Sequence, residues 1–134
     1  MSRLSPGTLW RRCAVLTASA ALVVAVALLA RDRFDPPYRI AGASAERGRV
    51  ALADYGCRTC HTIPGAGAFE PTVGPPLAGW SRRAVIAGEL PNTPPNLERW
   101  ITDPQGVEPG TAMPDTGVPA STARDISQYL YTLR

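Results

Sequence analysis

The apolar residues of this 134-residue chain form one long uninterrupted run near the N-terminus. The run covers residues 13–30 and contains no charged side chain. A helix of eighteen residues would rise about 27 Å, close to the roughly 30 Å hydrocarbon thickness of a bilayer. We therefore expect a transmembrane helix that contacts the lipid bilayer through residues 13–30. A cleaved signal peptide is the alternative, although its apolar core usually covers only about 7–15 residues.

Three shorter stretches, at 48–55, 93–101 and 126–133, repeat apolar residues with the spacing of one helix face. Gly48 would allow the first and the last of these helices to cross closely. No stretch shows a convincing strand pattern. The expected fold class is therefore all-α, with a small helical domain preceded by a single transmembrane helix.

Local residues predict where these helices begin and end. Thr93, followed by proline, is a typical cap for the second helix, and the Asp-Pro pair at 103–104 would end it. Thr122 with Asp125 predicts the start of the last helix. A short helical turn is also expected over residues 83–88.

The formal net charge of +3 is unevenly distributed. Residues 1–40 hold six arginines and two aspartates (6 − 2 = +4), whereas residues 41–134 hold eight arginines and nine acidic residues (8 − 9 = −1). The basic character therefore belongs to the N-terminal part, and we expect no nucleic-acid partner.

The most informative chemical motif is Cys57-Arg58-Thr59-Cys60-His61. This spacing predicts one covalently attached c-type haem, with a thioether to each cysteine and His61 on the iron. The two sulfurs, three positions apart, would lie on one side of a helical turn. As a zinc site the motif lacks a fourth ligand, and as a thioredoxin-like pair it lacks a βαβ context.

Met113 is the predicted second axial ligand, by exclusion. The chain has one histidine, no lysine, and two methionines, of which the other is the initiator. His61/Met113 ligation would raise the reduction potential and leave no open iron position. We therefore expect an electron-transfer protein without a small-molecule substrate and without enzyme activity of its own. A non-catalytic subunit of an oxidase complex is included in this expectation. A gas-binding sensory haem protein is the alternative, if Met113 is easily displaced.

These motifs together resemble a class I c-type cytochrome over residues 43–134. The stretch 86–105 is similar to the cytochrome c domain fused to subunit II of some haem-copper cytochrome c oxidases. This chain lacks the copper-binding domain of those subunits, and it lacks the lysine that they often carry before the ligand-loop glycine. The resemblance rests on Gly48-Arg49, Gly56 with the haem motif, Gly74-Pro75-Pro76-Leu77, Trp100, Met113-Pro114 and Asp125-Ile126 with Tyr129-Leu130.

The resemblance also implies roles for residues around the haem. The backbone carbonyl of Pro75 would accept a hydrogen bond from Nδ1 of the iron-ligating histidine. Leu77 would pack on the porphyrin. Trp100 and Arg83 would reach a buried haem propionate.

Because haem attachment in such proteins takes place outside the bacterial cytoplasmic membrane, the haem domain is expected on the periplasmic face of a single-pass protein. We expect a cytoplasmic N-terminus (1–12), an anchor (13–30), a linker (31–42) and a haem domain (43–134). Such a protein would carry single electrons between membrane respiratory complexes, to or within a terminal oxidase. An electron-entry subunit of a dehydrogenase is the alternative.

Overall fold

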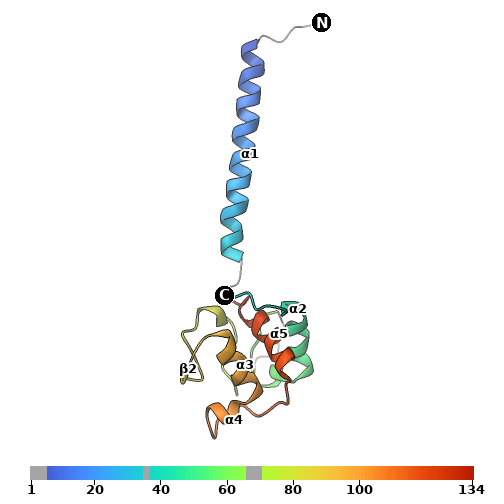
Figure 1. The fold of residues 1–134 in the computed structure, drawn as a ribbon, viewed down its shortest axis with the longest axis vertical. Helices are drawn as coiled ribbons and strands as arrows, with labels where there is room; N and C mark the ends of the chain where they lie inside the picture. The colour runs from blue at the N-terminus through green and yellow to red at the C-terminus, as the bar shows by residue number, and fades with distance from the viewer. Residues whose placement is uncertain (1–5, 35–36, 66–70) are drawn as a thin grey trace. The chain divides into compact units, whose positions relative to one another are not determined.

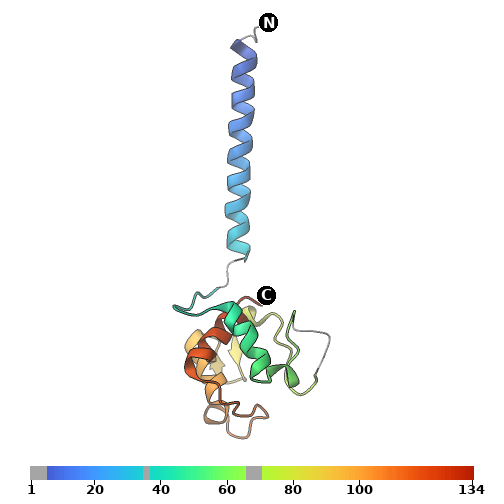
Figure 2. The same cartoon turned by 90° about the vertical axis from the view of Figure 1, so that its right-hand side faces the viewer.

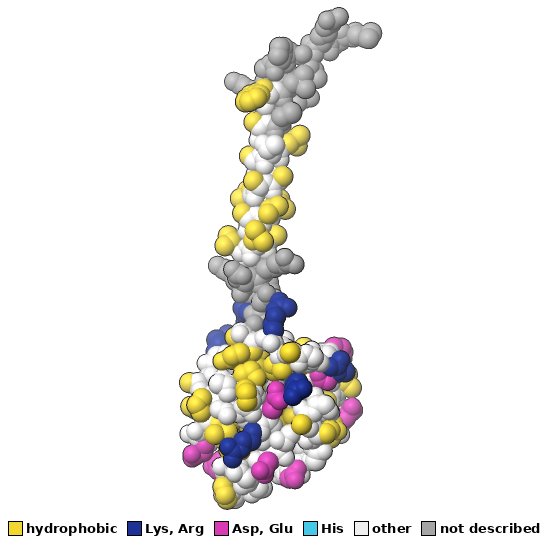
Figure 3. All heavy atoms as spheres, viewed as in Figure 1, with side chains coloured by type: hydrophobic (Ala, Val, Ile, Leu, Met, Phe, Trp, Pro, Cys, Tyr) yellow, Lys and Arg dark blue, Asp and Glu magenta, His cyan; other side chains and the backbone are white. Residues whose placement is uncertain are grey.

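The computed structural model describes residues 6–34, 37–65 and 71–134. The chain forms two compact units, Met1–Asp35 and Pro36–Arg134. The first unit contains one helix, α1, which runs from Pro6 to Phe34 (Figure 1). Its described side chains are those of Trp10 and residues 14–29, and all of them are exposed. Apolar side chains follow one another along the visible face of this helix (Figure 3).

The prediction of a membrane anchor over residues 13–30 is wrong. Among the described residues, no helix combines the length and the apolar character needed to cross a membrane. The predicted lipid contact and the single-pass localisation in the cytoplasmic membrane depended on this anchor and are wrong with it. Residues 1–5 and 35–36 of the predicted N-terminus and linker lie outside the described residues.

The second unit is built mainly from short helices (Figures 1 and 2). Helix α5 packs against both α2 and α3. The short helices η1 and η2 and two strands occupy the connections. The elements are α2 (Ala45–Asp54), η1 (Cys57–Thr59), η2 (Trp80–Arg82), β1 (Val85–Ile86), β2 (Leu90–Pro91), α3 (Pro94–Thr102), α4 (Pro104–Val107) and α5 (Ala120–Leu130).

The crossing of α2 and α5 depends on Gly48. A Cβ atom at this position would lie 2.0 Å from the backbone oxygen of Asp125, far inside van der Waals contact. The prediction that Gly48 lets these two helices approach closely is therefore confirmed. The same crossing is held by an ion pair, since Arg47 Nε lies 2.6 Å from the Asp125 carboxylate.

The predicted helix boundaries are confirmed for α3 and wrong for α5. Thr93 is the N-cap residue of α3, which ends before Asp103 as expected. Helix α5 begins at Ala120, two residues before Thr122. The carboxylate of Asp125 does not cap its own helix. It accepts hydrogen bonds from the Ser44 backbone N–H (2.6 Å) and from Arg47 instead.

The all-α prediction also needs correction, because residues 85–91 form a small hairpin and not the expected helical turn. Val85 pairs with Pro91 and Ile86 with Leu90 in an antiparallel two-stranded sheet. The turn contains Ala87 at φ 53°, a left-handed conformation that is uncommon for a residue with a side chain. Strands of two residues are too short to show an alternating pattern in the sequence.

The core of the second unit lies between the helices and the hairpin. The first residues of the second unit contact this core through Tyr38. The centre of the Tyr38 ring lies 4.7 Å from the centre of the Tyr131 ring, in an edge-to-face arrangement. Gln128 of α5 holds the same segment, accepting from the Ile40 N–H and donating to the Tyr38 carbonyl. The most deeply buried apolar side chains include Leu52, Ile86, Leu97, Ala123, Ile126, Leu130 and Tyr131.

Candidate functional site

The Cys57–His61 motif forms one tight turn after α2. Gly56 precedes the turn in a left-handed conformation (φ 71°), which ends α2 and reverses the chain direction. The His61 backbone N–H then donates to the Cys57 carbonyl at 3.0 Å, which closes the turn. Cys57 and Cys60 are free thiols, and both are partly buried. The turn thus presents the two sulfur atoms and the imidazole within five residues of chain.

The segment 74–77 runs beside this turn and supports the imidazole. The Gly74 N–H donates to the Cys60 carbonyl at 2.7 Å, and the Leu77 N–H donates to the Thr62 carbonyl at 2.8 Å. A Cβ atom at Gly74 would lie 2.6 Å from both Nδ1 and Cε1 of His61. Glycine is therefore required at this position for the ring to lie against the backbone.

The proton position on His61 follows from its partner. Nδ1 lies 2.8 Å from the Pro75 carbonyl oxygen, which can only accept a hydrogen bond. The proton is therefore on Nδ1 when the imidazole is neutral, and the lone pair is on Nε2. This arrangement leaves Nε2 available to bind a metal ion and makes it a stronger donor.

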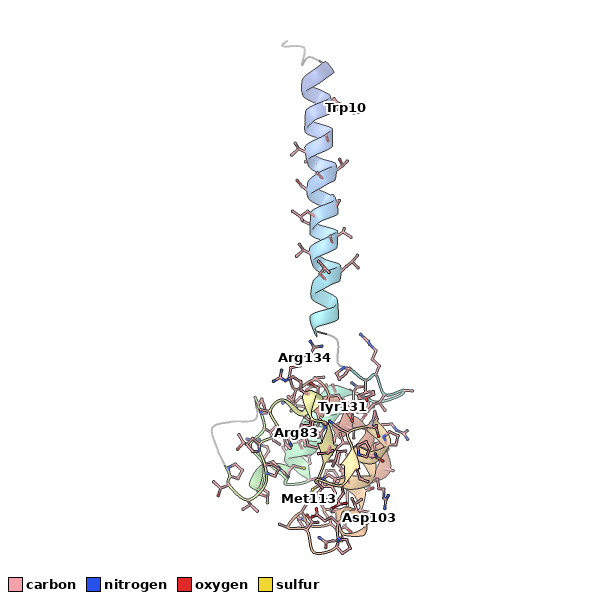
Figure 4. All side chains as sticks on the ribbon, turned by 90° about the vertical axis from the view of Figure 1, so that its left-hand side faces the viewer. Trp10, Arg83, Asp103, Met113, Tyr131 and Arg134 are labelled. Carbon is pink, nitrogen blue, oxygen red and sulfur yellow. The ribbon has the colours of Figure 1, made fainter. Side chains whose placement is uncertain are left out.

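A cavity of about 440 Å³ lies beside this turn. Its volume is within the range of roughly 300–1,000 Å³ that is common for sites of small molecules and cofactors. Figure 4 labels Arg83 and Met113, two residues of its wall. The wall contains all eight residues predicted for the site, namely Cys57, Cys60, His61, Pro75, Leu77, Arg83, Trp100 and Met113. The structure thus brings them together, while their roles toward a cofactor stay predictions.

Met113 reaches this cavity from a loop between α4 and α5. The side chain is partly buried, and residues 108–118 around it form no helix or strand. The Thr111 N–H donates to the Glu108 carbonyl at 3.1 Å, and Gly110 adopts φ 87°. The loop thus folds back on itself just before Met113.

Trp80 is a wall residue that the sequence analysis did not identify. Its side chain is 5% exposed, and its Nε1 is one of two buried side-chain polar atoms without a hydrogen-bond partner among the described residues. The Arg83 guanidinium lies 4.8 Å from the centre of the Trp80 ring and donates to the Pro76 carbonyl. Burial lowers the pKa of Arg83, although a guanidinium stays charged at neutral pH. An unpaired N–H and a cation on one wall suit an anionic group of a ligand.

Asn92 holds the backbone of both Trp80 and Arg83. Its side-chain amide donates to the Trp80 carbonyl at 3.1 Å and to the Arg83 carbonyl at 3.0 Å. Its side-chain oxygen accepts from the hydroxyl of Tyr131 at 2.9 Å. Asn92 is 9% exposed and Tyr131 is fully buried. No single-residue pattern in the sequence points to this network, because its members lie up to 51 positions apart (131 − 80).

The two alternatives for the cysteine motif gain no support. Burial raises the pKa of the Cys57 thiol, whereas a redox-active pair requires a lowered pKa. Among the residues that the structure describes, no group of three or more His, Cys, Asp or Glu side chains could hold a metal ion. The haem stays a prediction.

Comparison with known proteins connects this chain with a respiratory oxidase. The chain is 31% identical, over 139 aligned positions, to cytochrome c oxidase subunit 2 of Alkalihalophilus pseudofirmus. The alignment covers 96% of this chain and 39% of that subunit, so the chain spans about two fifths of its relative's length. No protein-family model matches the chain.

This similarity corrects the prediction that the protein is not an enzyme. The relative is a subunit of an oxidase, and hence a part of an enzyme complex. The prediction rested on the absence of an open iron position within this chain alone. Such an argument says nothing about the catalytic activity of a complex to which the chain contributes.

Proposed function

We propose that the second unit binds one c-type haem and serves in the transfer of single electrons within a terminal oxidase. The observation that supports this proposal best is the shared cavity wall. It carries two free thiols, an imidazole with its proton held on Nδ1, and the thioether of Met113. The similarity to cytochrome c oxidase subunit 2 favours an oxidase over a dehydrogenase as the complex.

Each wall residue has a chemical role in this proposal. Cys57 and Cys60 would hold the haem by thioether bonds, and His61 and Met113 would bind its iron. The bound haem would supply a one-electron Fe(III)/Fe(II) couple. The Pro75 carbonyl keeps the proton on Nδ1 of His61 and so strengthens donation from Nε2. With both His61 and Met113 as ligands, the iron would have no position left for oxygen or water.

Trp80 and Arg83 extend this proposal to the carboxylates of the haem. A haem carries two carboxylates, and the unpartnered Trp80 N–H with the adjacent Arg83 guanidinium is suited to receive one of them. Trp100, for which the resemblance implied this role, also lines the cavity but is only partly buried. We therefore propose Trp80 as the indole donor.

Mass spectrometry of the denatured protein tests the haem directly. We expect the full chain, produced with a haem-attachment apparatus, to retain the mass of one haem after acid denaturation. Cys57→Ser with Cys60→Ser should abolish this retention. Cys13→Ser is the matched control and should leave it unchanged. A wild-type protein without added mass would rule out covalent haem.

Co-purification tests the role in an oxidase. If the chain serves within a terminal oxidase, isolation of that oxidase through another subunit should yield this chain in stoichiometric amount. Reduced haem in the isolated complex should be oxidised when oxygen is admitted. Absence of the chain from the isolated oxidase would contradict this part of the proposal and leave the haem assignment standing.

A further inference from the structure

The side chain of Gln105 makes three hydrogen bonds to the loop that carries Met113. The Gln105 amide nitrogen donates to the Thr111 carbonyl at 2.9 Å and to the Met113 carbonyl at 3.0 Å. The Gln105 side-chain oxygen accepts from the Gly110 N–H at 3.1 Å. The two carbonyl partners and the one N–H partner also fix which end of the amide is nitrogen. Both amide N–H groups and the oxygen are thus used on this one loop.

Gln105 is itself held firmly by its position in α4. The Asp103 carboxylate accepts from the Gly106 N–H at 2.8 Å and so caps this helix. The Asp103 N–H donates to the Arg99 carbonyl of α3 at 2.9 Å. Pro104 is among the most deeply buried residues of the chain. The backbone next to Gln105 is therefore anchored to the core at one end of the Met113 loop, and the buried Val118 anchors the other end.

We infer that Gln105 is a positioning residue for Met113, which keeps the loop closed so that the thioether stays in the cavity. This inference rests on the proposed function, in which Met113 binds the haem iron. An amide is required, because a glutamate at the same position would direct a carboxylate at two carbonyl oxygens. Alanine at this position would remove the three hydrogen bonds from α4 and leave those within the loop, from the Thr111 N–H to the Glu108 carbonyl and from the Gly117 N–H to the Asp115 carboxylate.

Carbon monoxide binding to the reduced, haem-loaded full chain measures how often the Met113 loop opens. Loss of three exposed hydrogen bonds should raise the opening equilibrium, and hence the initial rate of carbon monoxide binding, by about tenfold in Gln105→Ala and Gln105→Glu. The absorption band of sulfur-ligated ferric haem should weaken in parallel. Hydrogen exchange at the Gly110 amide should accelerate in both variants.

Asn96→Ala is the matched control. The Asn96 amide also donates to a backbone carbonyl, that of Pro91, and lies outside the cavity wall. The Asn96→Ala variant should leave the rate of carbon monoxide binding and the hydrogen exchange of the Gly110 amide unchanged. Far-ultraviolet circular dichroism shows whether each variant is folded, and Gln105→Glu provides a second variant if Gln105→Ala is unstable.

The outcomes separate the inference from the proposed function. A wild-type protein without haem, or one that binds carbon monoxide at once, overturns the haem or the Met113 ligation, and the inference with it. A wild-type protein that resists carbon monoxide, with Gln105 variants that resist it equally, overturns the inference alone. Faster binding in the Gln105 variants, together with an unchanged Asn96→Ala control, supports it.

Discussion

Gly74 lies against the ring of His61. This ring occupies the space that a Cβ atom at position 74 would need. Gly74→Ala would place a methyl group 2.6 Å from Nδ1 and Cε1 of the imidazole. We expect the ring to move away from the Pro75 carbonyl and the free energy of unfolding to fall by about 1–3 kcal/mol. Loss of the Nδ1 hydrogen bond weakens donation to iron, so the reduction potential of the haem-loaded protein should rise.

Urea unfolding and a redox titration measure these two effects of Gly74→Ala. Gly42→Ala is a suitable control, because Gly42 has φ 74° and a Cβ atom added there would meet no atom within 4 Å. This control should lose about 1 kcal/mol through backbone strain and keep the potential of the wild type. A Gly74→Ala protein with the wild-type potential would show that the ring tolerates the methyl group.

Sequence reasoning identified the residues whose chemistry is expressed in a local motif. Cys57, Cys60 and His61 are adjacent in the chain, and Met113 was reached because the composition offers so few other ligands. Trp80 was missed, because an indole in a helix of only three residues, η2, has no pattern that distinguishes a core residue from a ligand-binding one. Its unpartnered nitrogen becomes visible only after the surrounding side chains are placed.

At the level of elements, the loop before the hairpin is held by the buried amide of Asn92. Asn92→Ala would leave the Tyr131 hydroxyl and the carbonyls of Trp80 and Arg83 without this partner. We expect a loss of about 2–4 kcal/mol in the free energy of unfolding, because unpaired buried polar groups keep their desolvation cost.

Tyr131→Phe should cost less than Asn92→Ala, about 1–2 kcal/mol, since only the Asn92 oxygen loses its partner. Urea unfolding of both single variants and the double variant measures the coupling between them. Additive losses would contradict a shared network. Asn96→Ala, which removes an exposed amide, serves as the control and should change stability by less than about 1 kcal/mol.

The contact between α2 and α5 gives the second unit a dependence on pH. Hydrogen bonds from Arg47 and from the Ser44 N–H hold the pKa of Asp125 below its ordinary value. A carboxyl group whose pKa is lowered in the folded state stabilises that state above its unfolded pKa of about 3.9, and this contribution disappears as the pH falls through the folded pKa.

Urea unfolding between pH 7 and about pH 3 tests this linkage. The wild type should lose stability below about pH 4, and Asp125→Asn should be less stable at neutral pH and show a shallower decline in acid. Glu46→Gln is the matched control. Glu46 forms an exposed pair with Arg49 one turn away, and the hydrogen bonds of this pair stay within α2. Parallel pH profiles for the wild type and Asp125→Asn would contradict the role of Asp125.

Elements with several helical turns could be predicted from the sequence, and elements decided by distant contacts could not. The periodic stretches predicted the helices α2, α3 and α5, and Gly48 predicted the close crossing of α2 and α5. The start of α5 was misplaced because the Asp125 side chain is taken by Ser44 and Arg47, which lie some 80 positions away in the chain. The hairpin over residues 85–91 was missed because its register depends on only two residue pairs.

At the level of the whole molecule, a count of uncharged residues was an insufficient criterion for the N-terminal part. The run 13–30 predicted a membrane anchor, and the structure does form a helix there, α1. Among the residues that the structure describes, however, no helix is long and apolar enough to cross a membrane. The helix itself was thus predicted correctly, and the conclusion drawn from it was wrong.

The charge of the second unit bears on how it would meet an oxidase. The second unit, residues 36–134, carries a formal charge of 0 (nine arginines against nine acidic residues), and none of the cations is lysine. On the face shown in Figure 3, arginine and acidic side chains are interspersed and form no large patch of one sign. Long-range steering, which accelerates association between strongly charged surfaces, would therefore contribute little.

We accordingly expect the haem-loaded chain, added back to an oxidase from which it has been removed, to associate and transfer electrons at a rate that depends weakly on salt. The rate constant should change by less than about twofold between low and physiological ionic strength, whereas a steered pair loses much of its rate over that range. Stopped-flow oxidation at several salt concentrations measures this dependence. A steep fall with salt would instead require a cluster of one charge at the contact surface, and reversal of single arginines, beginning with Arg58 beside the cysteines, would then locate it.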